Sequence, residues 1–105
     1  MSEPKPHIMI VEARFYNELA DEMAAGAIEA LEAAGATYER FSVAGALEIP
    51  GAINYAILNQ KLMGQHRFDG YVALGCVIRG ETTHYDYVCG ESARGIMDLQ
   101  LKYGL

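Results

Sequence analysis

The chain has 105 residues, of which 51% are hydrophobic, and its 14 acidic and 8 basic side chains give a net charge of −6. This length allows one domain with a modest core, and the apolar content exceeds that of a disordered chain. The negative charge and the scattered Lys and Arg residues argue against a broad surface for nucleic acid or an anionic membrane.

The first half of the chain predicts a strand, a helix and a second strand. Residues His7–Ala13 form a short apolar run, which is typical of a strand buried on both faces. A helix is predicted from Asn17, a plausible N-cap, to a stop signal at Gly35. Thr37–Val43 then alternates in polarity, which predicts a second and less deeply buried strand. The apolar stripe expected on the helix consists of Leu19, Met23, Ala27, Ile28 and Leu31.

The second half repeats this order. After a loop over residues 44–49, Pro50 fits the first position of a helix, because its missing N–H costs nothing there. A polar link over residues 64–69 leads to a third strand over residues 70–78, which is apolar throughout. A third helix is predicted from about residue 84 to residue 102, with Gly104 as its C-terminal cap. The expected inner residues are Ile53, Ala56, Ile57 and Gln60 in the second helix and Val88, Ser92, Ile96 and Leu99 in the third.

Strand and helix therefore alternate three times, which predicts a doubly wound α/β fold with a parallel sheet and helices on both faces. The alternation also predicts a further strand after Leu105. The sequence contains no internal repeat and no linker between domains. We expect residues 1–105 to form a single α/β domain that is incomplete at its C-terminus.

The cellular location and the state of the cysteines follow from similar arguments. No segment approaches the roughly 20 apolar residues of a membrane span, and residues 1–6 are too polar for a signal peptide, so we expect a cytoplasmic protein. Cys76 and Cys89 lack the close spacing of a redox or zinc motif and are expected to be reduced. A metal site is not supported, because His84 and Cys89 would point to different faces of one helix, with no third ligand in view.

In open parallel sheets, ligands bind beyond the carboxyl ends of the strands. Here this rule selects residues 12–15, 44–48 and 76–84. Phe15 in the first segment either stacks on a flat ligand or fills the gap between strand and helix. Glu48 in the second either accepts hydrogen bonds from ligand hydroxyls or only favours the dipole of the helix that follows.

The third segment is the richest in polar groups and reads Gly-Cys-Val-Ile-Arg-Gly-Glu-Thr-Thr-His-Tyr-Asp over residues 75–86. Thr83 and Asp86 have the spacing of a capping box, which places His84 in the first helical turn. His84 is either a proton-transfer group or a surface histidine, whereas His7 and His66 are expected to have surface roles. Residues 80–83 offer N–H groups and hydroxyls to a phosphate, and Arg79 meets either an anion or a structural carboxylate.

Three motifs at these strand ends are similar to one known family. They are Ala13-Arg14-Phe15, the sequence Gly-Ala-Leu-Glu-Ile-Pro over residues 45–50, and residues 75–89. Their order and spacing closely resemble 6,7-dimethyl-8-ribityllumazine synthase over essentially the whole chain. The resemblance implies a flavodoxin-like, three-layer αβα fold and a role in riboflavin biosynthesis. The implied reaction condenses 5-amino-6-(D-ribitylamino)uracil with 3,4-dihydroxy-2-butanone 4-phosphate, with neither a metal nor an organic cofactor.

The resemblance also implies roles for particular residues. Phe15 would stack on the pyrimidine, and His84 would move protons as the catalytic residue. Ala46 and Glu48 would bind the ribityl chain, and Leu47 belongs to the same substrate-binding segment. The remaining substrate-binding residues are Cys76, Val77 and Ile78, which would hold the ring through backbone groups, and Glu81 and Thr82, which would contact the phosphorylated ketone.

Family members assemble as pentamers or larger shells with sites at subunit interfaces, and they continue past the position of Leu105 with a fourth strand and two helices. We therefore expect the chain to match the amino-terminal two thirds of a member, and a chain ending there to be weakly active and to assemble poorly. Tyr16, Leu47 and Gly90 depart from common family residues. Two other interpretations stay open: a non-catalytic flavin- or lumazine-binding or assembly module, and a generic flavodoxin-like phosphate-binding domain.

Overall fold

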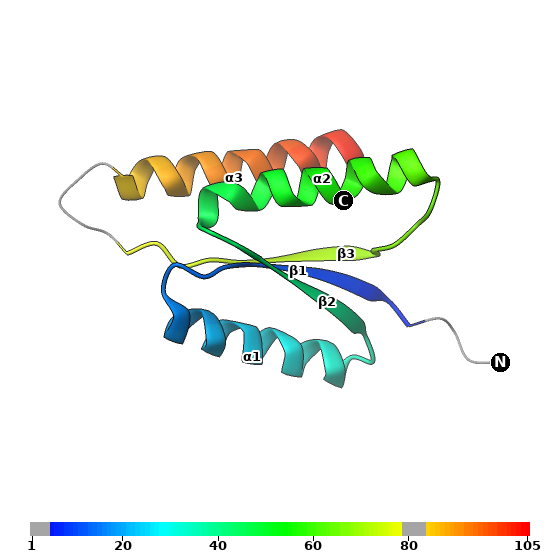
Figure 1. Cartoon of the computed structure of the whole chain (residues 1–105), viewed down its shortest axis with the longest axis horizontal. Helices are drawn as coiled ribbons and strands as arrows, with labels where there is room; N and C mark the ends of the chain where they lie inside the picture. Colours follow the sequence, from blue (N-terminus) through cyan, green and yellow to red (C-terminus); the bar gives the residue numbers. More distant parts are fainter. Residues whose placement is uncertain (1–4, 79–83) are drawn as a thin grey trace.

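The structure, a computed structural model, describes residues 5–78 and 84–105. In this part of the chain, three parallel strands form one sheet in the order β2-β1-β3. Helix α1 covers one face of the sheet, and α2 and α3 cover the other (Figure 1). The predicted doubly wound, three-layer αβα fold is therefore confirmed. The elements are β1 (His7–Ala13), α1 (Asn17–Ala33), β2 (Thr37–Val43), the 3-10 turn η1 (Ala46–Glu48), α2 (Ile49–Met63), β3 (Gly70–Leu74) and α3 (His84–Tyr103).

The central strand β1 pairs with both neighbours. Its whole length pairs with β2, from His7 opposite Thr37 to Ala13 opposite Val43, and both strands have the predicted bounds. The third strand is shorter than predicted, because it ends at Leu74 instead of residue 78. Beyond Leu74, β1 continues toward β2 alone: the Arg14 N–H donates to the Val43 carbonyl at 3.2 Å. Residues 75–78 therefore leave the sheet.

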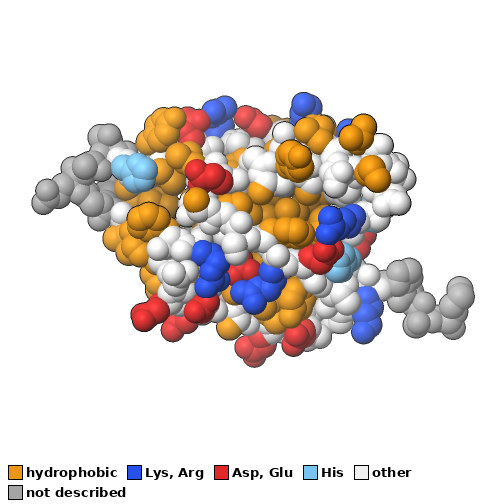
Figure 2. Space-filling view, viewed as in Figure 1, with side chains coloured by type: hydrophobic (Ala, Val, Ile, Leu, Met, Phe, Trp, Pro, Cys, Tyr) orange, Lys and Arg blue, Asp and Glu red, His pale blue; other side chains and the backbone are white. Residues whose placement is uncertain are grey.

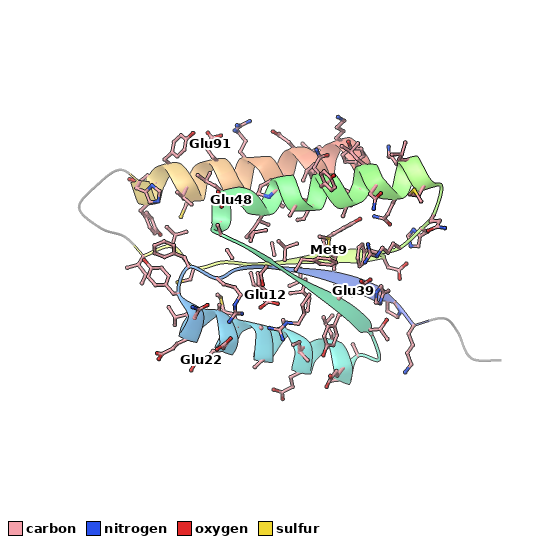
Figure 3. The ribbon with its side chains drawn as sticks, viewed as in Figure 1. Met9, Glu12, Glu22, Glu39, Glu48 and Glu91 are labelled. Carbon is pink, nitrogen blue, oxygen red and sulfur yellow. The ribbon has the colours of Figure 1, made fainter. Side chains whose placement is uncertain are left out.

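The main core lies between the sheet and the two helices α2 and α3. Met9 points from β1 into this layer (Figure 3). Phe68 is also buried, which the predicted polar link did not anticipate, whereas the other residues of that link, 64–67 and 69, are exposed as expected. The Gln60 side chain explains how the link folds inward, because its Oε1 accepts the N–H groups of Arg67 and Phe68 at 2.8 and 3.0 Å. The buried members of this cluster are Met9, Val11, Ala13, Ile49, Ile53, Ile57 and Phe68.

Helix α1 differs from the prediction at its start and in its buried face. The N-cap is Tyr16, which makes no side-chain capping bond, so Asn17 is the first helical residue and not the cap. Ala20 and Ala24 are the buried side chains, while Leu19 of the predicted stripe is exposed. The predicted end is confirmed, because Gly35 adopts a φ of 78°, a conformation that glycine reaches without strain.

The other helices begin and end close to the predicted positions. Helix α2 starts with Ile49 and has Pro50 second, so the predicted start was one residue late. Helix α3 extends one residue beyond the prediction and buries Val88. Gly104, with a φ of 67°, donates its N–H to the Gln100 carbonyl and caps this helix as expected. Thr83 of the predicted capping box lies outside the described residues.

A polar cluster closes the amino-terminal end of the sheet. The His7 Nε2 lies 2.8 Å from Glu39 Oε2, and its Nδ1 lies 2.6 Å from the Thr37 hydroxyl. The His7 ring also stacks on Phe68, with centroids 5.5 Å apart. The His7 side chain is still 31% exposed, so it takes part in a polar cluster at the surface, and His66 is exposed as predicted.

The outer surface of the helical layer carries several apolar side chains. On the face shown in Figure 2, such side chains lie between the charged ones over α2, and basic and acidic side chains lie together near β2. No helix among the described residues is long and apolar enough to cross a membrane. The largest exposed apolar residues of the two helices are Tyr55, Leu58, Leu62 and Met63 in α2 and Tyr87, Met97 and Leu101 in α3.

Candidate functional site

A pocket of about 380 Å³ opens beyond the carboxyl ends of the three strands. This volume is in the range of small-molecule sites, about 300–1,000 Å³. Every predicted site residue within the described part of the chain lines this pocket. Glu81 and Thr82 lie outside the described residues, as does Arg79. The lining residues are Phe15, Tyr16, Ala44, Gly45, Ala46, Leu47, Glu48, Cys76, Val77, Ile78, His84 and Val88.

The strand ends converge at Gly75, immediately after β3. A Cβ added to Gly75 would lie 3.5 Å from the Cβ of Ala46 and 3.7 Å from the Cβ of Ala13. Ala13 ends β1, and Ala46 opens the turn after β2. Residues that are distant in the sequence are thus brought close together at the ends of the strands, next to the pocket-lining residues Ala46 and Cys76.

Phe15 stands on the loop between β1 and α1 with 75% of its surface exposed. A ring that filled the gap between strand and helix would be buried, so this alternative does not fit. The ring of Tyr16 contacts Phe15 edge-on, with centroids 5.0 Å apart and an interplanar angle of 77°. The Phe15 ring therefore lines the pocket as an open aromatic surface, suited to stacking on a flat ligand.

Glu48 enters the pocket from the turn between β2 and α2. Its backbone N–H donates to the Gly45 carbonyl at 3.1 Å, which holds the 3-10 turn closed. As N-cap of α2 it makes no side-chain capping bond, and the exposed carboxylate lines the pocket (Figure 3). A ligand hydroxyl would find an acceptor here, and the start of α2 favours its negative charge.

His84 is the first residue of α3 and brings an imidazole to the pocket. Residues 76–78 reach the pocket as non-strand backbone, since β3 ends at Leu74. Cys76 and Cys89 are both free thiols, as predicted. Among the described residues, no three His, Cys, Asp or Glu side chains form a group that could hold a metal ion. The described groups suited to chemistry are thus an imidazole, a carboxylate and an aromatic ring.

Glu12 was expected with the site-forming loop, but it belongs to β1, points toward α1 and is only 2% exposed (Figure 3). Arg40 donates to its two oxygens at 2.7 and 2.9 Å, and Arg14 donates to one of them at 2.7 Å. The hydrogen bonds from Arg40, supported by Arg14, hold the pKa of the Glu12 carboxyl below 4.5, although burial opposes this shift. The sequence feature that could have indicated this buried ion-pair network is a single carboxylate inside an otherwise apolar strand.

Sequence reasoning also missed two lining residues. Tyr16 was noted only as a departure from the family pattern, and Val88 only as part of the inner face of a helix. The sequence offered one signal for each: Tyr16 directly follows Phe15, and Val88 lies one helical turn after His84, on the same face of the helix.

A larger pocket of about 660 Å³ lies at the other end of the molecule, between α2, α3 and the start of β3. Gln60, Lys61, Tyr71 and Tyr103 are among its lining residues, and none of the predicted site residues is. We assign the site to the smaller pocket, because it lies at the carboxyl ends of the strands, where parallel sheets bind ligands.

A parallel sheet covered by helices on both faces, with a pocket beyond the carboxyl ends of its strands, defines a flavodoxin-like α/β protein. Within this class, the family model for 6,7-dimethyl-8-ribityllumazine synthase matches residues 5–105. The chain belongs to the 6,7-dimethyl-8-ribityllumazine synthase family.

Three curated relatives agree with this assignment. The chain is 57% identical to 6,7-dimethyl-8-ribityllumazine synthase 1 of Rhizobium meliloti, over 100% of the chain and 69% of the relative. It is 54% identical to the synthase of Agrobacterium fabrum, over 96% of the chain and 68% of the relative. It is 53% identical to that of Bartonella bacilliformis, over 90% of the chain and 59% of the relative. The chain thus spans 59–69% of the length of these relatives.

Proposed function

We propose that the protein condenses 5-amino-6-(D-ribitylamino)uracil with 3,4-dihydroxy-2-butanone 4-phosphate to form 6,7-dimethyl-8-ribityllumazine, a transferase step of riboflavin biosynthesis. The observation that carries this proposal is that Phe15, Glu48 and His84, from three separate elements, line one pocket. Relatives with 53–57% identity bear the name of the enzyme that makes this product.

In this proposal each side of the pocket takes one part of the substrates. The Phe15 ring stacks on the pyrimidine, and the segment from Ala46 through Leu47 to Glu48 binds the ribityl hydroxyls. Cys76, Val77 and Ile78 hold the pyrimidine through backbone groups that lie outside the sheet. Glu81 and Thr82 contact the phosphorylated ketone.

The chemistry needs orientation and proton transfer. The pyrimidine amine adds to the ketone, and the adduct loses water to give an imine. Phosphate then departs, and the ribityl-bearing nitrogen attacks the remaining carbonyl, so that the ring closes with loss of a second water. His84 takes the proton released by the attacking amine and returns one to the departing oxygen. An amine and a ketone react without catalysis, so fixing their geometry and supplying one proton carrier account for most of the acceleration.

We also propose that residues 1–105 act as one domain, that the protein assembles into pentamers or larger shells, and that it works in the cytoplasm. Large apolar side chains exposed on α2 and α3, among them Leu62 and Leu101, support self-association. The two free thiols suit a reducing compartment. Sedimentation velocity of the whole protein, with any residues that follow Leu105, tests the assembly, and a monomer at micromolar concentration would contradict it.

Mixing the two substrates and following the fluorescence of the lumazine product tests the reaction. We expect His84→Ala to lower the enzymatic rate above background by about 10²-fold or more, the typical effect of losing a general acid–base group. His66→Ala is the matched control, since His66 is an exposed histidine at the other end of the sheet, and it should react like the unmodified protein. Product binding without any acceleration would contradict the proposal and favour a binding module.

A further inference from the structure

The position of Phe15 is not explained by its own packing. Three quarters of its surface is exposed, and the ring meets its neighbour Tyr16 only edge-on. An aromatic side chain that stacks on a ligand must already point the right way, because ordering it on binding lowers the affinity. Something other than the core must therefore hold the loop that carries it.

Arg14, the residue before Phe15, is held on three sides. Its backbone N–H donates to the Val43 carbonyl at 3.2 Å and fixes the strand end to β2. Its guanidinium donates through Nη1 to Glu12 and through Nη2 to Asp21. Glu12 belongs to β1 and Asp21 to α1, so one side chain bridges the two elements that flank the loop.

The Glu12 end of this bridge is buried and is hydrogen-bonded from a second side. The Glu12 side chain is 3% exposed, and Arg40, on β2, donates hydrogen bonds to both of its carboxylate oxygens. The Arg14 side chain is 23% exposed, and it is absent from the pocket lining. Arg14 thus acts behind the pocket wall and not on the ligand.

The local energetics favour a positioning role over a purely stabilising one. A buried ion pair contributes little net stability, because removing two charges from water offsets much of their attraction, and its best-supported use is to fix one arrangement. The flat guanidinium suits this use, since its separate N–H groups reach two carboxylates in fixed directions, which an ammonium does not reproduce.

We propose that Arg14 is a positioning residue that holds Phe15 in the orientation needed for stacking, through its simultaneous pairing with Glu12 and Asp21. This inference rests on the proposed function for the ligand that Phe15 meets. The effect of Arg14 on the orientation of residue 15 does not depend on which ligand binds.

The chain contains no tryptophan, so Phe15→Trp introduces a single indole at the position of interest. Time-resolved fluorescence anisotropy then measures the local motion of that side chain without any ligand. We expect Arg14→Gln to increase the amplitude of fast indole motion about twofold or more. Arg14→Lys should give an amplitude between those of Arg14→Gln and the parent, since an ammonium keeps the positive charge but lacks the planar set of N–H donors. Arg94→Gln, which removes two exposed ion pairs on α3, with Glu91 and Asp98, is the control and should leave the indole motion unchanged.

Asp21→Asn guards against a general loss of structure, because it removes only the exposed partner and leaves buried Glu12 paired with two arginines. It should also loosen the indole while the free energy of unfolding stays close to that of the parent. Unchanged indole motion in Arg14→Gln and Asp21→Asn would overturn the proposal.

Titration with 6,7-dimethyl-8-ribityllumazine provides the functional readout in the Phe15 background. Arg14→Gln should raise the Kd about two- to tenfold, the loss expected when one aromatic contact is misplaced. An unchanged Kd in a protein that binds the lumazine would overturn the positioning role. If the unmodified protein does not bind the lumazine, the proposed function fails, while the anisotropy result still decides whether Arg14 orders residue 15.

Discussion

Gly95 and Gly90 lie in the same helix, α3, and give a matched test of how closely this helix packs on α2. A Cβ added to Gly95 would lie 2.8 Å from Cγ and 2.9 Å from Cβ of Pro50, whereas one added to Gly90 meets nothing within 4 Å. Carbon atoms pack at about 3.5–4.0 Å, so Gly95→Ala requires the two groups to move apart by roughly 0.7 Å or more. The Pro50 side chain is closed into a ring on its own backbone nitrogen, so Cβ and Cγ cannot rotate away. The two helices must therefore move apart.

The magnitudes follow from two opposing effects. Replacing glycine by alanine inside a helix stabilises it by about 1 kcal/mol, and this gain applies to both positions. Overpacking at Gly95 costs about 1–3 kcal/mol in addition. We therefore expect Gly90→Ala to raise the free energy of unfolding by about 1 kcal/mol and Gly95→Ala to fall about 1–3 kcal/mol below it.

Urea denaturation followed by far-ultraviolet circular dichroism measures both values under one condition. Because helix propensity is common to the two variants, their difference isolates the contact with Pro50. The same contact links α3, which carries His84, to α2, which follows Glu48, so Gly95→Ala should also slow lumazine formation while Gly90→Ala does not. Equal stabilisation by both substitutions would refute the close packing of these helices.

Two further substitutions test other parts of the fold. Glu12→Gln removes the charge that Arg14 and Arg40 contact and should lower the free energy of unfolding by about 1–3 kcal/mol near pH 7. Since the pKa of Glu12 is depressed below 4.5, the folded state binds fewer protons than the unfolded state, so this contribution is complete above that pH and is lost as the pH falls through the folded-state pKa. Urea titrations at decreasing pH should show the free energies of unfolding of the two proteins converging. A difference that stays constant with pH would contradict a stabilising charge on Glu12. Gly64→Ala should lower the free energy of unfolding by roughly 1–2 kcal/mol, because Gly64 has a φ of 65°, which alanine adopts only with strain. Gly51→Ala should raise the free energy of unfolding, because an added Cβ there meets nothing within 4 Å and alanine favours the helix. A thermal melt in which Gly64→Ala is the more stable variant would contradict the left-handed turn at Gly64.

Features that depend on neighbouring residues in the chain were predictable from the sequence. The bounds of β1 and β2 followed from apolar runs and from alternation, and the helix ends at Gly35 and Gly104 from the conformational freedom of glycine. The location of the candidate site, the pocket beyond the carboxyl ends of the strands, followed from a general property of parallel sheets, which needs only the order of the elements. The predicted residues Phe15, Glu48 and His84 therefore share one pocket.

Features that depend on distant partners were decided by the tertiary structure alone. Apolar residues continue past Leu74, but β3 pairs with β1 only as far as Leu74, and Ala13 at the end of β1 pairs with β2 alone. Phe68 looked like part of a polar link, and its burial depends on the amide of Gln60, which receives the backbone of that link.

Glu12 shows most clearly that the sequence alone does not reveal contacts with distant partners. A carboxylate at the end of an apolar strand gives no local sign of whether it faces solvent, a ligand or a helix. Its burial is possible only because Arg40, on the neighbouring strand, and Arg14 supply two guanidinium groups to it. The sequence by itself determined the elements and the end of the sheet where the site lies, since these follow from local periodicity. The tertiary structure decided which charges are buried and which strand pairs extend, since both depend on groups brought together across the sheet.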